Sequence, residues 1–513
     1  MVIVIFLVTL LALLCGYFKW LHTYWKRKGI DGPSGFPFIG SFYQLADRKF
    51  PRGLIINQWT KTYGQVFGYY EGATPVLVIS DLEMLQEMFV KKFDCFYHRK
   101  MTHMITGNLE SVKEEPRVNL FSAQGSRWKR LRALMTPVFS VKSVKKIHAT
   151  MEDSVLAMVA LLEKHVDGEP FNILEYYQEL TYDVVSRLAM GQPHSELFNN
   201  EQVDMVRKIF DRTQRVWPWY LTVTFPYFKN AIKDFFFKHP NVRGGDVGKL
   251  HKICENAVQI RLKERAENAE KNVEKEQNDF IDMFLDYYSE SVKDGVFGET
   301  VEKKVTADDV VGACFLFLLA GFDTTANTLA YASYLLAKNP AKMDIAQEEV
   351  TRVCRSPNIS YDEIVGLKYM DAVVKESMRL YPVGAFACSR TCMKSTTLGN
   401  LQIDVGVSVE ADVHALHRST EIWGDNPDVF FPERWLDPNA AHRHNMSWIP
   451  FGAGPRQCVG IRMGMIEVKL ALAHILRKYS MIGGAHSEKE LNLIGCATMA
   501  PEKVTVYLET RFG

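Results

Sequence analysis

Residues 450–460 read PFGAGPRQCVG and lead directly into a helical pattern at Ile461–Lys478. Cys458 therefore lies where a glycine-rich loop enters a helix. Free N–H groups at a helix N-terminus stabilise a thiolate, so we expect the pKa of Cys458 to lie below its ordinary value of about 8.5 and the sulfur to bind a metal. Gly454 and Gly460 allow the backbone to approach a flat cofactor. A buried cysteine in an ordinary turn is the structural alternative.

Composition limits the kind of protein. The chain has 513 residues, 47% hydrophobic and 24% charged, which suits a large core and excludes disordered and fibrous classes. Its 61 lysines and arginines against 60 aspartates and glutamates leave a net charge of +1, so no nucleic acid partner is expected. Nine cysteines without a CxxC pair argue against a disulfide framework or a structural zinc site and indicate a reducing compartment. The sequence also lacks the motifs of phosphate-cradling loops and serine hydrolases.

The N-terminus predicts a single-pass membrane helix over residues 1–21. Val2–Phe18 contains no charge, and about 20 apolar residues are needed to cross a bilayer. A basic cluster follows at residues 26–28, so the positive-inside rule places the rest of the chain in the cytosol. A cleavable signal peptide is the alternative, but no basic residue precedes the apolar stretch and no small-residue cleavage pattern follows it.

Residues 22–45 predict a basic, Pro/Gly-rich hinge, and residues 46–513 predict the globular domain. Helical periodicity dominates this domain and β-like alternation is confined to short runs, so we expect a mainly α fold with small β-sheets. The clearest helical runs are 82–90, 127–134, 141–165, 174–190, 249–265 and 307–337, and the clearest strand runs are 74–80 and 401–410. The aromatic-rich stretch 216–237 fits either a helix pair in the core or a surface that dips into a membrane.

The cysteine loop resembles the haem-ligand loop of the cytochromes P450, whose pattern is F-x-x-G-x-R-x-C-x-G. All five fixed positions are met, by Phe451, Gly454, Arg456, Cys458 and Gly460. The resemblance implies the cytochrome P450 fold. It also implies that the Cys458 thiolate is the axial ligand of a b-type haem iron and that the other four residues bind the cofactor.

Two further stretches resemble signatures of the same family. One is the helical pair Glu376-x-x-Arg379, and the other is FPERW at residues 431–435. Glutamate and arginine three residues apart share one helix face and can pair. By resemblance, Glu376, Arg379 and Arg434 form a buried structural triad. Trp435 replaces the more usual phenylalanine, an aromatic substitution from which we expect little effect.

Residues 320–325 (AGFDTT) place polar groups inside an apolar helical pattern. Buried Asp and Thr are costly unless hydrogen-bonded, although a Thr hydroxyl can bond a local backbone carbonyl. The stretch resembles the family motif A/G-G-x-[DE]-T-[TS], whose acid and alcohol deliver protons during oxygen activation. Asp323 and Thr324 are therefore the predicted catalytic pair, Thr325 supports them, and Ala320 is predicted to lie against the cofactor. A polar patch in a core helix is the structural alternative.

Residues 128–132 (WKRLR) resemble the family's W-x-x-x-R helix, in which the indole N–H of Trp128 and the guanidinium of Arg132 face a haem propionate. Arginine suits a carboxylate because its N–H groups form a fork. Similarity further suggests Arg99, Arg390 and Arg456 as propionate partners. We expect Cys388 and Cys392 in the core, since no nearby histidine completes a metal site.

The matches run along essentially the whole chain, which looks like a eukaryotic microsomal P450, closest to the drug- and steroid-metabolising clan. The resemblance implies a monooxygenase that inserts one oxygen atom of O2 into a lipophilic small molecule at the endoplasmic reticulum membrane, with its catalytic domain facing the cytosol. Electrons would come from NADPH through NADPH-cytochrome P450 reductase, with cytochrome b5 as a further donor. The cations predicted to flank the cysteine side are Lys129, Arg130, Arg462 and Lys469. They are either the groups that meet an acidic electron donor or ordinary surface charge. The predicted pocket positions are 105–120, Phe317, Ala320, 383–386 and 497–499.

Two alternatives remain at this point. One is a haem-thiolate isomerase or dehydratase on the same fold, against which the intact pair of Asp323 and Thr324 argues. The other is a non-catalytic haem-binding membrane protein, which would tolerate loss of that pair. The apolar pocket positions imply a lipophilic substrate, but a steroid, a fatty acid and a foreign compound are not separated, because one methylene group is worth only about 1 to 3 kcal/mol in such a pocket.

Overall fold

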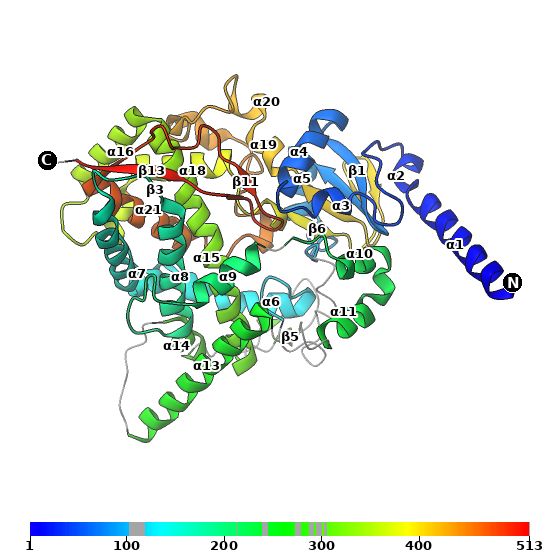
Figure 1. The fold of residues 1–513 in the computed structure, drawn as a ribbon, viewed down its shortest axis with the longest axis horizontal. Helices are drawn as coiled ribbons and strands as arrows, with labels where there is room; N and C mark the ends of the chain where they lie inside the picture. Colours follow the sequence, from blue (N-terminus) through cyan, green and yellow to red (C-terminus); the bar gives the residue numbers. More distant parts are fainter. Residues whose placement is uncertain are drawn as a thin grey trace.

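The computed structural model describes residues 1–101, 118–211, 213–238, 245–271, 279–286, 292–293, 300–301 and 305–511. Helix α15 (Ala307–Lys338) runs through the helical part, where α8 (Ile173–Met190), α13 (Asp246–Glu270) and α21 (Ile461–Lys478) pack against it (Figure 1). The other helices are α1 (Val2–Leu21), α2 (Tyr24–Arg27), α3 (Phe42–Leu45), α4 (Arg52–Tyr63), α5 (Leu82–Gln86), α6 (Gly125–Met135), α7 (Val141–Leu162), α9 (Gln202–Phe210), α10 (Trp217–Thr224), α11 (Lys229–Lys238), α14 (Phe280–Asp286), α16 (Pro340–Val353), α17 (Tyr361–Gly366), α18 (Lys368–Leu380), α19 (Val413–His417) and α20 (Thr420–Trp423).

A four-stranded sheet beside the helical part has the order β1-β2-β9-β6. Its strands are β1 (Val66–Glu71), β2 (Thr74–Ile79), β6 (Ser389–Thr391) and β9 (Ser408–Ala411), and only the β2–β9 pairing is parallel. Short strands form the smaller sheets: β3 (Phe171–Asn172) with β10 (Tyr479–Ile482) and β13 (Thr505–Thr510), β4 (Val292–Lys293) with β5 (Thr300–Val301), β7 (Thr396–Leu398) with β8 (Leu401–Ile403), and β11 (Leu493–Ile494) with β12 (Ala500–Pro501). The predicted fold class, mainly α with small sheets, is confirmed.

The strand predicted at 401–410 is in fact two strands of different sheets. β8 pairs with β7, whereas β9 lies parallel to β2 with Ser408 opposite Val76. Gly406 turns the chain between them with a φ of +87°, a conformation that glycine adopts without steric cost. Alternation in the sequence continues through the turn, so the pattern alone did not reveal the break.

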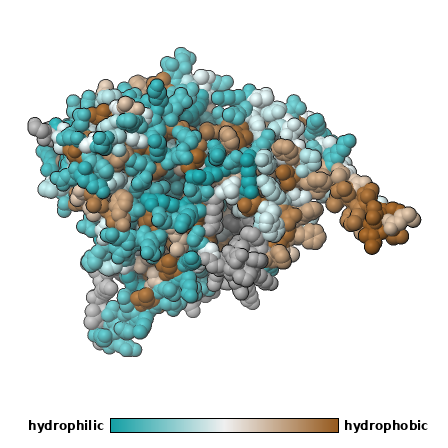
Figure 2. Space-filling view, in the orientation of Figure 1, coloured by the Kyte–Doolittle hydropathy of each residue, from teal (hydrophilic) through white to brown (hydrophobic). Residues whose placement is uncertain are grey.

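Within the described residues two helices, α1 and α15, are long and apolar enough to cross a membrane, but their surroundings differ. The most apolar window of α15 is 61% buried inside the protein, whereas that of α1 is 6% buried. Figure 2 shows α1 as a hydrophobic projection from a largely hydrophilic face. We therefore interpret α15 as the core helix of the domain and α1 as a candidate membrane anchor.

The chain that follows α1 packs onto the four-stranded sheet. The Trp25 indole is buried and donates its N–H to the Tyr69 carbonyl oxygen at 3.0 Å. A Cβ atom on Gly68 would lie 2.3 Å from this indole, so the strand admits the tryptophan only because residue 68 is glycine. Phe18, at the end of α1, packs edge-on against Phe38. These contacts attach the base of α1 to the sheet, and the domain boundaries at 21 and 45 stay predictions.

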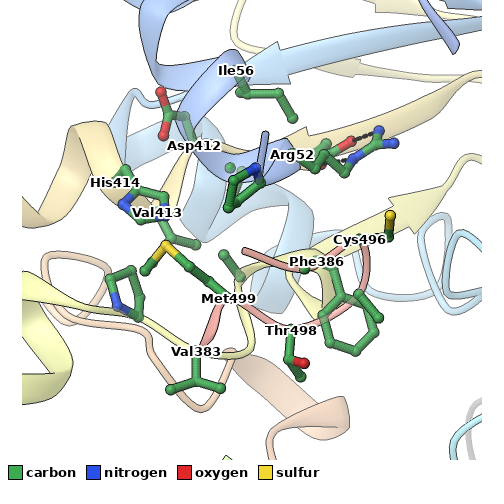
Figure 3. Close-up of a pocket in the computed structure, with 18 residues that line it drawn as sticks. Arg52, Ile56, Val383, Phe386, Asp412, Val413, His414, Cys496, Thr498 and Met499 are labelled. Carbon is green, nitrogen blue, oxygen red and sulfur yellow. Dashed lines mark hydrogen bonds and ion pairs between the residues drawn. The ribbon is translucent and has the colours of Figure 1, made fainter. Parts of the chain in front are cut away.

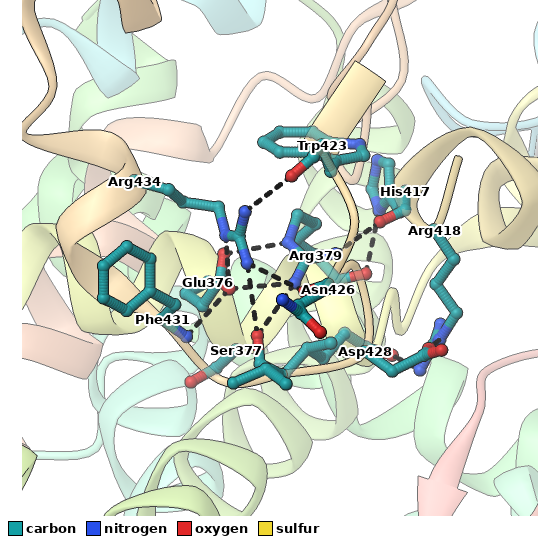
Figure 4. Close-up of polar contacts among 12 residues, drawn as sticks. Glu376, Ser377, Arg379, His417, Arg418, Trp423, Asn426, Asp428, Phe431 and Arg434 are labelled. Carbon is teal, nitrogen blue, oxygen red and sulfur yellow. Dashed lines mark hydrogen bonds and ion pairs between the residues drawn. The ribbon is translucent and has the colours of Figure 1, made fainter. Parts of the chain in front are cut away.

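Helix α18 carries Glu376, whose carboxylate collects hydrogen bonds from several elements (Figure 4). Arg379 donates to both carboxylate oxygens at 2.8 Å, and Arg434 donates through Nε at 2.9 Å. The backbone N–H of Phe431 and the indole N–H of Trp435 add donors at 3.1 and 2.9 Å. The three residues of the predicted triad are therefore together, and Trp435 belongs to the same network through a bond that phenylalanine does not form.

The triad is tied to the loop at 450–460 through His417, a residue that the sequence patterns did not indicate. Arg379 donates to the His417 carbonyl oxygen at 2.6 Å, and the His417 ring lies 3.2 Å from the Arg379 carbonyl oxygen through Nδ1. Burial keeps the pKa of His417 well below its ordinary value, so the ring is neutral. Its Nε2 then accepts the backbone N–H of Ile449 at 3.1 Å, directly before the loop.

We expect Trp435→Phe to reduce the free energy of unfolding by about 1.5 to 3 kcal/mol, the usual value of a hydrogen bond to a charged group. The matched control is Trp448→Phe, because Trp448 packs on Trp435 with ring centroids 5.2 Å apart and its buried indole N–H has no partner within the described part of the chain. Denaturant unfolding of both variants measures the difference. Equal losses in the two variants would contradict the proposed bond energy.

A second buried cluster of charges lies between α4 and the sheet. Arg52 Nη2 is 2.7 Å from Glu410 Oε2, and Lys100 Nζ is 2.6 Å from Glu71 Oε1. The Tyr69 hydroxyl lies between the two carboxylates, 2.9 and 3.0 Å from their oxygens. Burial by itself raises the pKa of Glu410, but Arg52 and Lys100 outweigh it and lower the pKa to about 2.

This lowered pKa predicts how stability depends on pH. The contribution of Glu410 is complete above its usual pKa of 4.5 and is lost as the pH falls toward 2. We expect Glu410→Gln to lose about 3 to 5 kcal/mol at pH 7, and this difference from wild type to shrink below pH 4.5. Thermal unfolding across this pH range measures the stability difference between variant and wild type. Glu421→Gln, at an exposed position, is the control. A difference that stays constant from pH 7 to pH 3 would count against Glu410 as its source.

Candidate active site

Backbone hydrogen bonds shape the loop around Cys458. The Cys458 N–H donates to the Phe451 carbonyl oxygen at 2.9 Å, and Gly460 is the N-cap of α21, as the pattern predicts. Arg132 on α6 donates to the Gln457 carbonyl oxygen at 2.5 Å and so holds the loop against α6. The predicted cysteine loop therefore contacts α6 and leads into α21.

Cys458 is exposed, whereas Cys388 and Cys392 are buried in the core as predicted. Although the residue is exposed, desolvation by the protein around it raises the pKa of the Cys458 thiol. The N–H of Gly460 and the charges of Arg132 and Arg99 lower the pKa by less. The prediction of a lowered pKa is therefore wrong, because desolvation outweighs the helix N-terminus. A coordinating metal cation itself removes the proton from a thiol, so this pKa does not argue against a metal ligand.

Gly454 lets the loop pass close to the segment Glu87–Lys91, which forms a single π-helical turn. Gly454 has a φ of +68°, and a Cβ atom there would lie 2.0 Å from the Phe89 carbonyl oxygen. No other residue type fits this contact without a shift of the backbone. The glycine of the motif is therefore required by packing against Phe89.

The predicted arginines converge on the cysteine loop from distant parts of the chain. Arg456 is buried and lies over the Trp128 ring, 4.6 Å from its centroid. Arg390 on β6 lies over the Phe89 ring and donates to the Ala453 carbonyl oxygen at 3.3 Å. Arg99 donates to the Arg456 carbonyl oxygen at 3.2 Å. Together with Arg132, these side chains place four guanidinium groups and one indole around the loop.

These guanidinium groups have no acidic partner among the described residues. Nε of Arg99, Nε of Arg390 and Nη1 of Arg456 are buried without a hydrogen-bond partner among the residues described. Burial lowers the pKa of each of the three, and repulsion from a neighbouring arginine of the set lowers it further. Buried like charges require an anion nearby. The two propionate groups of a haem fit this set of donors, and the exposed Cys458 thiol fits as the ligand of its iron.

The polar residues 320–325 lie on α15, which continues through them without a break. The Thr324 hydroxyl donates to the Ala320 carbonyl oxygen at 2.6 Å, and Ala320 is exposed. Asp323 and Thr325 are buried. No hydrogen bond joins Asp323 to Thr324, although both lie within the described residues, so the predicted pair points in two directions from the helix. A Cβ atom on Gly321 would lie 2.5 Å from Val185, so this glycine allows α8 to pack closely on α15.

Burial raises the pKa of Asp323 from 3.8 to about 6. The polar side chains of Thr498 and Asn327 oppose this rise, and Asp211 adds to it. A carboxyl group with a pKa near 6 exchanges protons readily close to neutral pH. The geometry therefore gives Asp323 the properties of a proton carrier.

Two of the predicted substrate-contacting segments line one pocket (Figure 3). Val383 and Phe386 come from the chain after α18, and Thr498 and Met499 come from the turn between β11 and β12. The backbone N–H of Met499 donates to the Val383 carbonyl oxygen at 3.1 Å, which joins the two segments. The remaining walls are formed by α4, β9 and the start of α19.

Other predicted pocket positions differ. Phe317 is buried against Phe139, Phe280 and Phe284, with ring centroids 4.9, 5.8 and 5.9 Å away, so it belongs to the core and the prediction is wrong. Periodicity placed it on the helix but did not show which face turns to the other aromatic rings. Residues 105–117 of the predicted pocket segment lie outside the described residues.

The cations predicted to meet an electron donor are mostly held within the protein. Arg130 pairs with Asp309 at 2.6 Å, and Arg462 donates to the Phe139 carbonyl oxygen at 2.9 Å. Lys469 is buried, with Asp371 at 3.4 Å. These three side chains therefore do not form the predicted docking patch, because helix packing directs them toward internal partners. Lys129 also has a partner in the protein.

Comparison with known proteins agrees with this geometry. Residues 30–506 match the family model described as cytochrome P450. The chain is 63% identical over 508 residues to the cytochrome P450 cyp-13B1 of Caenorhabditis elegans, covering 99% of each chain. It is 43% identical over 507 residues to CYP13A1 of the same organism, covering 96% of each. The exposed Cys458, the arginines around it and these matches together identify the chain as a member of the cytochrome P450 family of haem-thiolate monooxygenases.

Proposed function

We propose that Cys458 binds the iron of haem b as a thiolate in this chain. The observation that carries the proposal is a set of buried and half-buried arginines beside an exposed cysteine, for which the described part of the chain supplies no acidic partner. Phe451, Gly454 and Gly460 shape the ligand loop, and Ala320 lies against the cofactor from α15. The propionate partners are Arg99, Trp128, Arg132, Arg390 and Arg456.

The bound haem supplies the oxygen-activating chemistry, and electron donation from the thiolate favours cleavage of the O–O bond. The protein's side chains supply protons and hold the substrate. Asp323 carries a proton on its buried carboxyl group. The Thr324 hydroxyl passes it on after it releases the Ala320 carbonyl oxygen, and Thr325 supports this segment of α15.

The proposed substrate is a lipophilic small molecule of the steroid, fatty acid or xenobiotic type. The side chains of Val383, Phe386 and Met499, on the segments predicted to contact it, are apolar. Burial of apolar substrate surface against such groups contributes about 25 cal/mol per Å2. One oxygen atom of O2 enters this substrate.

The proposed site of action is the endoplasmic reticulum membrane, with α1 as the anchor and the catalytic domain in the cytosol. Exposed aromatic side chains at Trp217, Tyr227 and Phe228 support contact of the α10–α11 region with lipid. This region lies next to the end of α1, where Phe225 meets Phe18 with ring centroids 6.5 Å apart.

The proposed electron donor is NADPH-cytochrome P450 reductase, with cytochrome b5 as a further donor. Lys142 and Lys146 are exposed at the start of α7. Phe139 lies shortly before α7, and its carbonyl oxygen accepts a hydrogen bond from Arg462 at the start of α21. The two lysines therefore lie near the helix that follows the cysteine loop. They replace the internally held cations as candidates for an acidic partner, and the association rate would fall as salt increases.

The reduced carbon monoxide difference spectrum of the full chain tests the ligand assignment. We expect a thiolate-type Soret band in wild type and its loss in Cys458→Ala. The matched control is Cys388→Ala, since Cys388 is buried near Arg99 and Arg390 and should leave the band unchanged. Haem bound without this band in wild type, or a band that survives in Cys458→Ala, would overturn the assignment.

We expect Asp323→Asn to reduce product formed per NADPH by about 10² to 10⁴-fold, with peroxide formed instead, because the amide does not donate an acidic proton. Wild-type coupling should fall as the pH rises above about 6, where the Asp323 carboxyl becomes ionised, and the variant should lack this dependence. Asp308→Asn, at the exposed start of the same helix, is the control. The prediction fails if the variant keeps the wild-type pH profile of coupling.

A further inference from the structure

One face of α15 is attached to the chain turn between β11 and β12. Asp323, Asn327 and Tyr331 follow one another at intervals of four residues and therefore share this face. The buried Tyr331 hydroxyl donates to the Met499 carbonyl oxygen at 3.1 Å. Because Met499 follows Thr498, this bond holds the chain turn that carries Thr498 against α15.

Polar atoms on this face are buried without partners. Asp323 and Asn327 are 4% and 1% exposed. Oδ2 of Asp323 and both side-chain polar atoms of Asn327 have no hydrogen-bond partner in the described part of the protein. Buried polar groups in folded proteins are almost always hydrogen-bonded, to the protein or to ordered water. Asn327 also acts on the Asp323 carboxyl group, whose pKa it lowers. These three atoms, within one helical turn, are the partners that an ordered water would need.

Thr498 connects this face of α15 to the pocket of Figure 3. It lines the pocket together with His414 and Ala411. Its side chain also acts on the Asp323 carboxyl group, whose pKa it lowers. His414 is buried, and its Nε2 has no partner among the described residues. Nδ1 of His414 lies 3.5 Å from Arg418 and accepts from it, so Nε2 carries a hydrogen that a pocket water would accept.

We propose that protons reach Asp323 from this pocket through the Thr498 hydroxyl and a water that Asn327 holds. A pocket water donates a proton to the Thr498 oxygen while the Thr498 hydroxyl hydrogen passes to the Asp323 carboxylate, directly or through the held water. Bulk solvent returns a proton to the pocket water, which therefore also ends unchanged. Thr498 ends unchanged, and Asp323 gains one proton. The inference rests on the proposed role of Asp323 as proton carrier. Thr498 and Asn327 are positioning residues, since they act through Asp323.

The groups around Asp323 are consistent with a carboxyl group that receives protons from a donor. Burial favours its protonated form, and Asp211 beyond the end of α9 disfavours a second negative charge nearby. Thr498 and Asn327 act in the opposite sense and ease ionisation. A carboxyl group poised between these effects both takes up and releases a proton.

The direct test follows the Asp323 carboxyl band in the infrared spectrum of the full-length holoenzyme, identified by its loss in Asp323→Asn. In wild type the band should titrate with a midpoint near pH 6. Thr498→Val should raise the midpoint by about 0.5 to 1 unit, the scale of one lost hydrogen bond, and Thr498→Ser should restore it. An unchanged midpoint in Thr498→Val overturns the proposal. This measurement does not depend on catalytic activity.

The second test is product formed per NADPH. Thr498→Val should lower it about tenfold or more and Thr498→Ser should keep it, with the thiolate band present in both. Ala411→Val narrows the pocket without touching Asp323 and should lower coupling while the infrared midpoint stays at the wild-type value. If Ala411→Val forms as much product per NADPH as wild type, the proposed entry of protons from the pocket is overturned. If Thr498→Val changes KM but not the product formed per NADPH, the proposed relay is overturned. Such a result would mean that Thr498 only contacts the substrate. Loss of the thiolate band in wild type would instead defeat the proposed function.

Discussion

A single buried carboxylate, that of Glu376, connects the elements that position the cysteine loop. It accepts hydrogen bonds from Arg379, Arg434, Trp435 and the backbone of Phe431, so charge and hydrogen-bonding capacity are satisfied together. A buried charge is tolerated only in such surroundings. Through Arg379 and His417 the network continues to Ile449, at the entrance to the loop. The place of Cys458 thus depends on a salt bridge in a different helix.

The arginines around Cys458 differ from the Glu376 network, because their charges are not paired within the described residues. Arg390 and Arg456 are buried and Arg99 and Arg132 are half-buried, and none of the four has an acidic partner in the described residues. The two propionate groups of the proposed haem would supply the missing negative charge. Binding of such a group stabilises the native state by linkage, since the unfolded chain does not hold the guanidinium groups together. Haem binding and folding of the cysteine side are therefore expected to support each other.

Helix α15 separates two environments. Thr324 and the exposed Ala320 lie on one side, while Asp323, Asn327 and Tyr331 lie on the side that meets the β11–β12 turn. Asp323 and Thr324 are adjacent in the motif, yet they occupy different faces because successive residues of a helix are about 100° apart. In the proposed mechanism a proton must therefore move from the buried face with Asp323 to the face with Thr324 and Ala320. The polar groups around Asp323 matter because they decide how readily it takes up and releases that proton.

Local spacing and motif chemistry were enough to predict the fold class, the cysteine loop, the helices that carry Glu376 and Asp323, and the residue types of the proposed haem site. The direction of the Cys458 pKa shift, the burial of Phe317, and the internal pairing of Arg130 and Lys469 became visible only in the folded chain. Each of these depends on which groups from distant segments surround a side chain. The bond from Trp435 to Glu376, the link through His417 and the contact between Asp323 and Thr498 have the same origin. Hydrogen-bond partners and desolvation are set by packing between segments, and no periodicity within one segment encodes them.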